Sequence, residues 1–188
     1  MSKHTIVALV QDRPGVLNRI ASKWRQRGFN IESLTVGHSE IDGLSRMTFT
    51  VDGTTTDVDQ VTKQMYKVIE VVKVSDLTEH DMVYRELGLI KVNAPTNQRG
   101  AIIEIAEIFR AKILDVAPDS VIVEVTGTED KVDAMLELLR PYGIKELVRT
   151  GRVAMTRGAG TTTAAGETFE HHRYRPAGEG KPKVGSLI

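Results

Sequence analysis

The sequence contains no cysteine, and this absence excludes disulfides, thiolate metal ligands and cysteine nucleophiles together. An excess of one charge is missing too: 25 basic residues balance 25 acidic ones, so we expect neither nucleic acid nor an anionic membrane as a partner. No apolar run approaches the roughly 20 residues needed to cross a bilayer. The first residues show no leader pattern, and we therefore expect a cytoplasmic protein.

Motifs of the common enzyme classes are also absent. No Gly-x-Gly-x-x-Gly follows a strand pattern, and the chain has no Gly-x-Ser-x-Gly. Gly180-Lys181 is not the end of a phosphate-binding loop, because Arg175 stands where that loop needs a glycine. His171 and His172 are adjacent, so they cannot share one helix face as zinc ligands do. These absences argue against a hydrolase or a metalloenzyme, and we expect no catalytic residue and no metal site.

The segment from Val10 to Ile20 has the pattern of a strand that turns into a helix. Asp12 is placed to cap the helix, and Pro14 suits its first turn. Gly15 lets another group approach the backbone closely. Free N–H groups at a helix start, together with the helix dipole, form a receptor for a carboxylate. With no catalytic side chain nearby, the segment favours a sensor of a small acid over an enzyme.

Two successive blocks of the sequence show the same order of expected elements. The first block has strand patterns at residues 5–10, 29–36, 44–51 and 71–75. The second block has them at residues 87–92, 113–116, 121–125 and 144–155. Each block also has two amphipathic helix patterns, one after its first strand and one after its third. The repeated β-α-β-β-α-β order predicts an α+β protein of two tandem ferredoxin-like domains.

Helix ends and domain limits follow from single residues and from composition. Asp57 and Thr128 are expected N-caps, and Gly28 is expected to end the first helix. The second helix has the expected apolar stripe Val58, Val61, Met65, Val68 and Ile69. We expect domains at residues 1–79 and 80–157, joined near Glu79-His80-Asp81. Residues 158–188 are rich in Gly, Pro and charge, which predicts a flexible tail.

The same strand and helix order occurs in the RNA recognition module, which stacks bases on aromatic side chains of its central strands. In the strand at 44–51, alternation places Met47, Phe49 and Val51 inward. The outward residues are then Arg46, Thr48 and Thr50, which offer no stacking platform. An RNA-binding role is therefore not favoured.

Taken alone, the segment at 10–20 is explained by an ordinary strand-to-helix turn. Gly28-Phe-Asn-Ile31, at the start of the second strand, changes this balance. In the expected fold this strand lies at one edge of the sheet, so Asn30 could reach the turn of a neighbouring subunit. An amide both donates and accepts hydrogen bonds, so it can meet the ammonium or the carboxylate of an amino acid. The ligand would then lie between two chains.

Several motifs resemble those of the regulatory (small) subunit of acetohydroxyacid synthase, also called acetolactate synthase. In the first block they are Asp-Arg-Pro-Gly-Val-Leu-Asn-Arg at 12–19, Gly-Phe-Asn-Ile-Glu-Ser-Leu-Thr-Val-Gly at 28–37 and Ser-Arg-Met-Thr at 45–48. In the second block they are Glu-Leu-Gly-Leu-Ile-Lys-Val at 86–92, Ile-Phe-Arg-Ala-Lys-Ile at 108–113, Val-Thr-Gly-Thr-Glu-Asp-Lys at 125–131 and Arg-Thr-Gly-Arg-Val-Ala at 149–154. The resemblance covers about residues 1–158.

This resemblance implies an N-terminal ACT domain, a ferredoxin-like regulatory module, that forms a homodimer and binds a branched-chain amino acid, usually valine, at the dimer interface. Carried over to matching positions, the effector contacts are Asp12, Gly15 and Val16 of one chain and Asn30 and Ile31 of its partner. Many relatives have Asn where this chain has Asp12. The carboxylate either strengthens binding of the ammonium or repels the effector's carboxylate.

The resemblance also implies a role without catalysis. A separate large subunit holds thiamine diphosphate, FAD and Mg²⁺ and condenses pyruvate with pyruvate or 2-oxobutanoate in branched-chain amino acid biosynthesis. The small subunit activates it and confers feedback inhibition by valine, so no cofactor is expected on this chain. The alternative is a free-standing ACT-type sensor that controls another protein or a transcript. A third reading, in which the chain is itself an enzyme, has no supporting residues.

Overall fold

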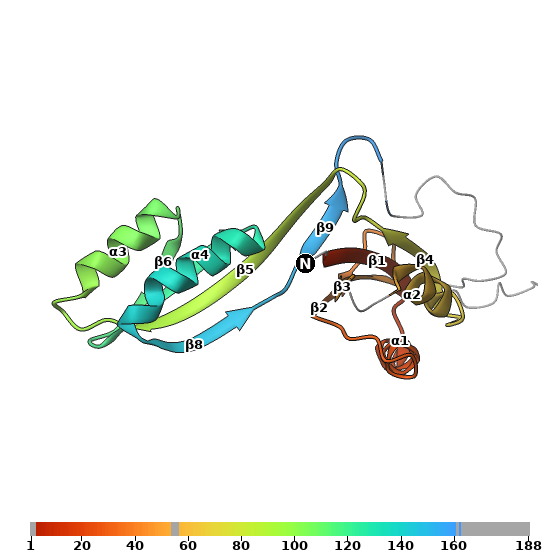
Figure 1. Ribbon diagram of the computed structural model, residues 1–188, viewed down its shortest axis with the longest axis horizontal. Coiled ribbons are helices and arrows are strands. Elements are labelled where there is room, and N and C mark those ends of the chain that lie inside the picture. The colour runs from red at the N-terminus through yellow and green to blue at the C-terminus, as the bar shows by residue number, and fades with distance from the viewer. Residues whose placement is uncertain (1–2, 54–56, 161, 163–188) are drawn as a thin grey trace, which may run out of the picture.

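The first of two antiparallel sheets is built as the sequence predicts (Figure 1). The computed structural model describes residues 3–53, 57–160 and 162. The first sheet has the order β2-β3-β1-β4 and consists of β1 (Lys3–Gln11), β2 (Ser33–His38), β3 (Leu44–Asp52) and β4 (Val71–Asp76). Its helices are α1 (Val16–Arg25) and α2 (Val58–Met65). Neither these helices nor any other in the described ranges is long and apolar enough to cross a membrane.

The second sheet repeats the pattern and extends it. Its elements are β5 (Met82–Asn93), α3 (Arg99–Ile108), β6 (Lys112–Val116), β7 (Ser120–Gly127), α4 (Glu129–Leu139), η1 (Arg140–Tyr142), β8 (Ile144–Arg149) and β9 (Val153–Thr156). The strand order is β6-β7-β5-β8, which confirms two tandem ferredoxin-like units. The single strand expected at 144–155 is wrong, because Gly151 (φ 77°) breaks it and β9 instead pairs with Met82–Arg85. Residues 163–188 of the expected tail lie outside the described residues.

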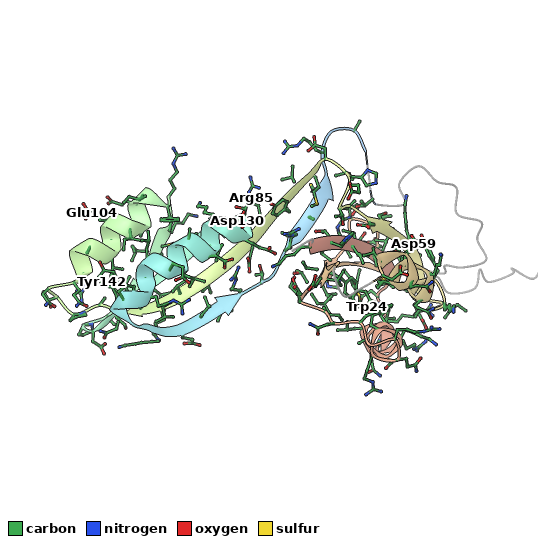
Figure 2. All side chains as sticks on the ribbon, viewed as in Figure 1. Trp24, Asp59, Arg85, Glu104, Asp130 and Tyr142 are labelled. Carbon is green, nitrogen blue, oxygen red and sulfur yellow. The ribbon has the colours of Figure 1, made fainter. Side chains whose placement is uncertain are left out.

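The core of the first domain lies between its sheet and its two helices. Trp24 of α1, labelled in Figure 2, packs on Phe49 of β3 with 4.7 Å between the ring centroids, and both side chains are buried. Met47 and Val51 face the same core, as the alternation predicts. Ile69 does not, because α2 ends at Met65 and leaves the Ile69 side chain 77% exposed. The expected stripe of the second helix is therefore wrong at its last residue.

Helix α1 begins later than the sequence suggests. Its N-cap is Gly15 (φ 85°), without a side-chain capping bond, so Asp12 is not the cap and Pro14 precedes the helix. The reason is that the pairing of β1 with β3 continues to Asp12, whose N–H donates to the Gly43 carbonyl at 2.8 Å, so the chain turns toward the helix only after this residue. The C-terminal end of α1 is as predicted, because Gly28 follows the last helical turn with a φ of 71°. Only a residue that tolerates positive φ adopts this conformation without strain.

Helix α2 provides a direct test of capping. The Asp57 carboxylate accepts a hydrogen bond from the Gln60 N–H at 3.1 Å, whereas Thr128 at the start of α4 makes no side-chain capping bond. Asp57→Ala should therefore lower the free energy of unfolding by about 0.5–2 kcal/mol. Thr128→Ala, the matched control, should cost less. Urea unfolding of both variants measures the difference, and equal losses would contradict the assignment of Asp57 as the functioning cap.

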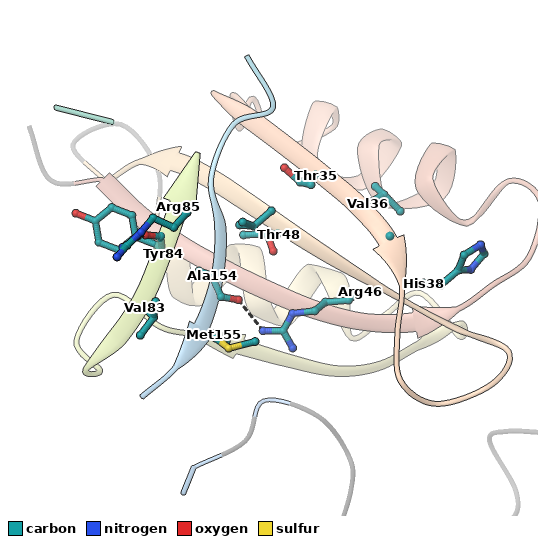
Figure 3. Close-up of a pocket in the computed structure, with 12 residues that line it drawn as sticks. Thr35, Val36, His38, Arg46, Thr48, Val83, Tyr84, Arg85, Ala154 and Met155 are labelled. Carbon is teal, nitrogen blue, oxygen red and sulfur yellow. Dashed lines mark hydrogen bonds between the residues drawn. The ribbon is translucent and has the colours of Figure 1, made fainter. Parts of the chain in front are cut away.

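The face of the first sheet without helices is covered rather than open to solvent. Thr48 and Thr50, expected to point outward to solvent, are 3% and 1% exposed. The cover is a two-stranded arm, formed by Met82–Arg85 of β5 and by β9, which crosses this face (Figure 3). Arg46 of β3 donates to the Ala154 carbonyl at 2.8 Å, and Ala154 packs with Val7 of β1. Sequence alternation could not predict this, because the covering residues, Met82–Arg85 and Val153–Thr156, lie far along the chain from β3.

Candidate functional site

The turn between β1 and α1 presents backbone N–H groups at the helix start, as the sequence predicts. The first regular helical bond is donated by the Arg19 N–H to the Gly15 carbonyl at 3.0 Å, and Val16 N–H makes only a long 3.4 Å contact to the Arg13 carbonyl. The N–H groups of a first helical turn have no acceptor inside the helix. A Cβ placed on Gly15 would meet no atom within 4 Å. The turn therefore has room for a small anion beside the positive end of the α1 dipole.

Two side chains at this turn were not predicted. His38, at the end of β2, places Nδ1 3.3 Å from the Asp12 carboxylate. Antiparallel pairing explains the contact. Gln11 is opposite Leu44 on β3, and His38 is opposite Ser45, so β1 and β2 end at the same end of the sheet, on either side of β3. Strand register, had it been worked out from the hairpin at 38–45, could have revealed this neighbour.

The second is Glu70, which fixes the position of α1. Its carboxylate is 8% exposed and pairs with the Arg19 guanidinium, and its carbonyl accepts a hydrogen bond from the Gln11 N–H at 2.9 Å. One residue thus holds both the end of β1 and the first turn of α1. In the sequence Glu70 resembles an ordinary solvated residue after a helix, so nothing there indicated its burial.

Asn30 and Ile31 lie at the opposite end of the sheet from the turn. They precede Ser33, which pairs with Thr50, whereas the turn lies near Ser45. Six residues of β2 separate the two ends, and a strand rises about 3.3 Å per residue, so the separation is roughly 20 Å. Asn30 is exposed, and Ile31 packs partly against the core. The structure therefore groups Asp12, Gly15 and Val16 but does not bring the other two beside them within one chain.

Two cavities lie where the first domain meets the chain beyond it. An apolar one of about 360 Å³ lies between β2, β3 and the arm, with Val36, Val83 and Met155 in its walls (Figure 3). A polar one of about 450 Å³ includes Lys3, Glu86 and Arg149. Within the described ranges no cluster of three His, Asp or Glu residues could hold a metal ion. Neither cavity holds an arrangement of nucleophile and base.

Lys3, in the polar cavity, allows a pH prediction. Burial alone would lower its pKa, but Glu129 and Glu32 outweigh burial and raise the pKa above its ordinary 10.5. A raised folded-state pKa gives stabilisation that is complete below about pH 10.5 and is lost as the pH rises through the folded pKa. The stability difference between the unaltered chain and Lys3→Met should therefore shrink from pH 9 toward about pH 12. Lys63→Met, which removes an exposed pair, is the control, and a difference that grows with pH would contradict the argument.

Comparisons with known proteins match both domains. Residues 6–73 match the family described as AHAS small subunit-like ACT domain, and residues 85–158 match the family described as small subunit of acetolactate synthase. A probable acetolactate synthase small subunit of Archaeoglobus fulgidus is 60% identical over 156 residues, 83% of this chain and 98% of the relative. The acetolactate synthase small subunit of Bacillus subtilis is 48% identical over 169 residues, 89% of this chain and 98% of the relative.

A solved structure agrees with the sequence relatives. The crystal structure of the acetolactate synthase small subunit from Thermotoga maritima superposes with a TM-score of 0.78 and is 41% identical in sequence. The similarity covers 85% of this chain and all of that chain. Fold and sequence therefore point to the same group of proteins.

Proposed function

Because the chain belongs to the acetolactate synthase small-subunit family, we propose that it activates a separate catalytic large subunit and makes that subunit sensitive to a branched-chain amino acid, valine. The proposal rests on the family matches, which cover both domains. Thiamine diphosphate, FAD and Mg²⁺ then belong to the large subunit, and this chain holds no cofactor and performs no chemistry itself. Its part in branched-chain amino acid biosynthesis is to bind the large subunit and the effector.

The effector site in this proposal lies between the first domains of two copies. Strand β2 is an edge strand, and within the described residues β3 is the one strand that it pairs with. On the other edge, the Tyr66 hydroxyl bonds the Val74 carbonyl at 3.2 Å and the Val74 N–H at 3.1 Å, which occupies both backbone polar groups that Val74 would offer to a new strand. The sheet can therefore accept a second copy at β2.

Two-fold pairing of β2 with β2 of a second copy would complete the site. When two identical edge strands pair antiparallel, the start of one lies beside the end of the other. Asn30 and Ile31 of one copy would then lie near His38 and the turn at 12–16 of its partner. Antiparallel pairing of this kind would bring together, across two copies, the residues that strand rise places roughly 20 Å apart within one chain.

Each group at this site has a chemical task that suits a small aliphatic amino acid. The N–H groups of Gly15 and Val16 would receive the carboxylate, and the Asn30 amide would accept a bond from the ammonium. Ile31 would supply an apolar wall for a branched side chain. Asp12 adds a second acceptor for the ammonium, and its carboxylate lies 3.3 Å from His38 Nδ1 of the same chain.

The effector can act only through a difference in affinity between two states of the assembly. A site shared by two chains has such a difference built in, because the ligand binds fully only when both chains are correctly placed. Valine would favour the arrangement that closes the site, and the large subunit would respond to that arrangement.

Reconstitution tests the proposal. The catalytic subunit is assayed for acetolactate formation alone and with this chain, and valine, leucine and isoleucine are then titrated into the complex. We expect the chain to raise activity, valine to reverse the gain, and the isolated chain to show no turnover. Valine binding by calorimetry without any gain in activity would favour the free-standing sensor instead. If the chain neither binds valine nor activates the catalytic subunit, both roles are rejected.

A further inference from the structure

The junction segment, residues 149–152, first anchors itself in the second domain. Arg149 makes a two-pronged pair with Glu86, whose side chain is 4% exposed, with both N–O distances at 2.7 Å. It also contacts the Asp133 carboxylate at 2.6 Å. Hydrogen bonds to Glu86 raise the pKa of the Arg149 guanidinium despite partial burial. The start of the segment is therefore fixed to β5 and α4.

The backbone of the junction segment then lies directly on the first domain. The Thr150 carbonyl accepts a hydrogen bond from the Thr35 hydroxyl of β2 at 3.1 Å. Gly151 has a φ of 77°, and a Cβ at this position would lie 2.6 Å from the Cβ of Ser33. Only glycine combines this backbone conformation with so close an approach.

Arg152 ties three separate parts of the molecule together. Its side chain is 8% exposed and donates to the Thr5 hydroxyl of β1 at 2.7 Å and to the Glu129 carboxylate of α4 at 3.0 Å. The guanidinium carbon lies 4.3 Å from the ring centroid of Tyr84 in the arm. Lys3 of β1 reaches the same Glu129 oxygen at 3.3 Å. One buried cation thus joins the first sheet, the arm and a helix of the second domain.

The charges around the polar cavity satisfy one another, which favours a structural use of the cavity over a ligand site. Lys3 and Arg149 each contact two carboxylates there, and Arg152 contacts Glu129, so each of these cations has an acidic partner of the same chain. A planar guanidinium that pairs, hydrogen-bonds and stacks at once tolerates few orientations of its partners. Removing one member of a buried pair leaves the other charge without compensation.

From this geometry we propose that Arg152 is the positioning residue of an interdomain lock, which makes the two domains turn as one body and so transmits the effector-bound state of the first domain to the second. This inference rests on the proposed function for what is transmitted, but the lock itself does not depend on it. Energetic coupling between distant sites requires an element whose arrangement both sites influence. Here that element is the contact of the junction segment with β1, β2 and α4.

Distance measurements between the domains test the lock directly. Because the chain has no cysteine, Asp59→Cys and Glu104→Cys introduce two spin labels at exposed positions on α2 and α3 (Figure 2). Mixed with an excess of unlabelled chain, so that a dimer carries only one labelled copy, the full chain should give one narrow distribution of distances, and Arg152→Met should broaden it at least about twofold. Arg157→Gln is the matched control, since it removes an exposed arginine pair on the same stretch of chain. A distribution for Arg152→Met as narrow as that of the control overturns the proposal.

A variant with a smaller structural change covers the case in which Arg152→Met fails to fold. Thr5→Val keeps the shape of the buried side chain and removes only the oxygen that Arg152 contacts in the first domain. It should broaden the same distribution, by less than Arg152→Met. An unchanged distribution in a folded Thr5→Val chain also counts against the lock.

Activity measurements then test transmission. On the isolated small subunit, both variants should keep a valine Kd within about twofold of the unaltered chain, because neither Arg152 nor Thr5 belongs to the proposed effector site. In complex with the large subunit, maximal inhibition at saturating valine should fall at least about threefold. Full inhibition together with a broadened distance distribution overturns the transmission role. If the unaltered complex does not respond to valine, the proposed function fails, and the distance distributions still decide the lock.

Discussion

Gly15→Asp is expected to weaken valine binding about fivefold to several hundredfold relative to Gly15→Asn. The aspartate would place a carboxylate where the effector's carboxylate is received, and two like charges about 4 Å apart repel by about 1 kcal/mol in water and about 4 kcal/mol near a protein surface. Each 1.4 kcal/mol is a factor of about ten in affinity. Calorimetry on the small subunit measures the two dissociation constants.

Asparagine is the matched control because it has the same size and the same tolerance of positive φ. Gly15 has a φ of 85° and open space around it, so both side chains fit without a clash. Asp and Asn both adopt this backbone region more readily than other residues. Activation of the large subunit should be the same for both variants, since the fold is unchanged. Equal valine affinities for Asp and Asn would show that the carboxylate binds elsewhere.

Gly151→Ala is expected to lower the free energy of unfolding by about 2–5 kcal/mol, through left-handed backbone strain and overpacking together. The added Cβ would lie 2.6 Å from the Ser33 Cβ and 2.9 Å from its hydroxyl, so the junction segment would have to leave β2. Urea unfolding followed by circular dichroism measures the loss.

Two further variants separate the causes. Ser33→Gly combined with Gly151→Ala removes the atoms of the clash but not the backbone strain, so it should recover part of the loss. Gly100→Ala introduces a Cβ that meets nothing within 4 Å in α3 and should be neutral or slightly stabilising. A Gly151→Ala chain as stable as Gly100→Ala would mean that the contact with Ser33 is not tight in solution.

The elements of both domains could be predicted because each carries its own local signal. Alternation in β3 identified the inward Met47, Phe49 and Val51, so one side of the first core followed from the sequence. Helix starts were less certain. Asp12 is a good capping residue by type, but the hydrogen bond from its N–H to the Gly43 carbonyl keeps it in the pairing of β1 with β3, and the cap falls on Gly15.

What could not be predicted depends on contacts between distant parts of the chain. Thr48 and Thr50 look like solvent-facing residues, yet the arm from the second domain buries both. Arg152 and Glu129 look like exposed charges until the second domain is placed against β1 of the first sheet. For the effector site, the type of each residue indicated a task, but the separation of Asn30 from Gly15 became visible only with the strand register.

The hydroxyl of Tyr66 on the outer edge of β4 has a consequence for how large an assembly can become. With both backbone polar groups of Val74 already occupied, a further strand at the outer edge of β4 would lose the hydrogen bonds at the middle of that edge. Joining two molecules through β2 leaves only the two β4 edges outside, each obstructed by its own Tyr66. Tyr66 thus hinders further growth of the sheet beyond a pair of molecules.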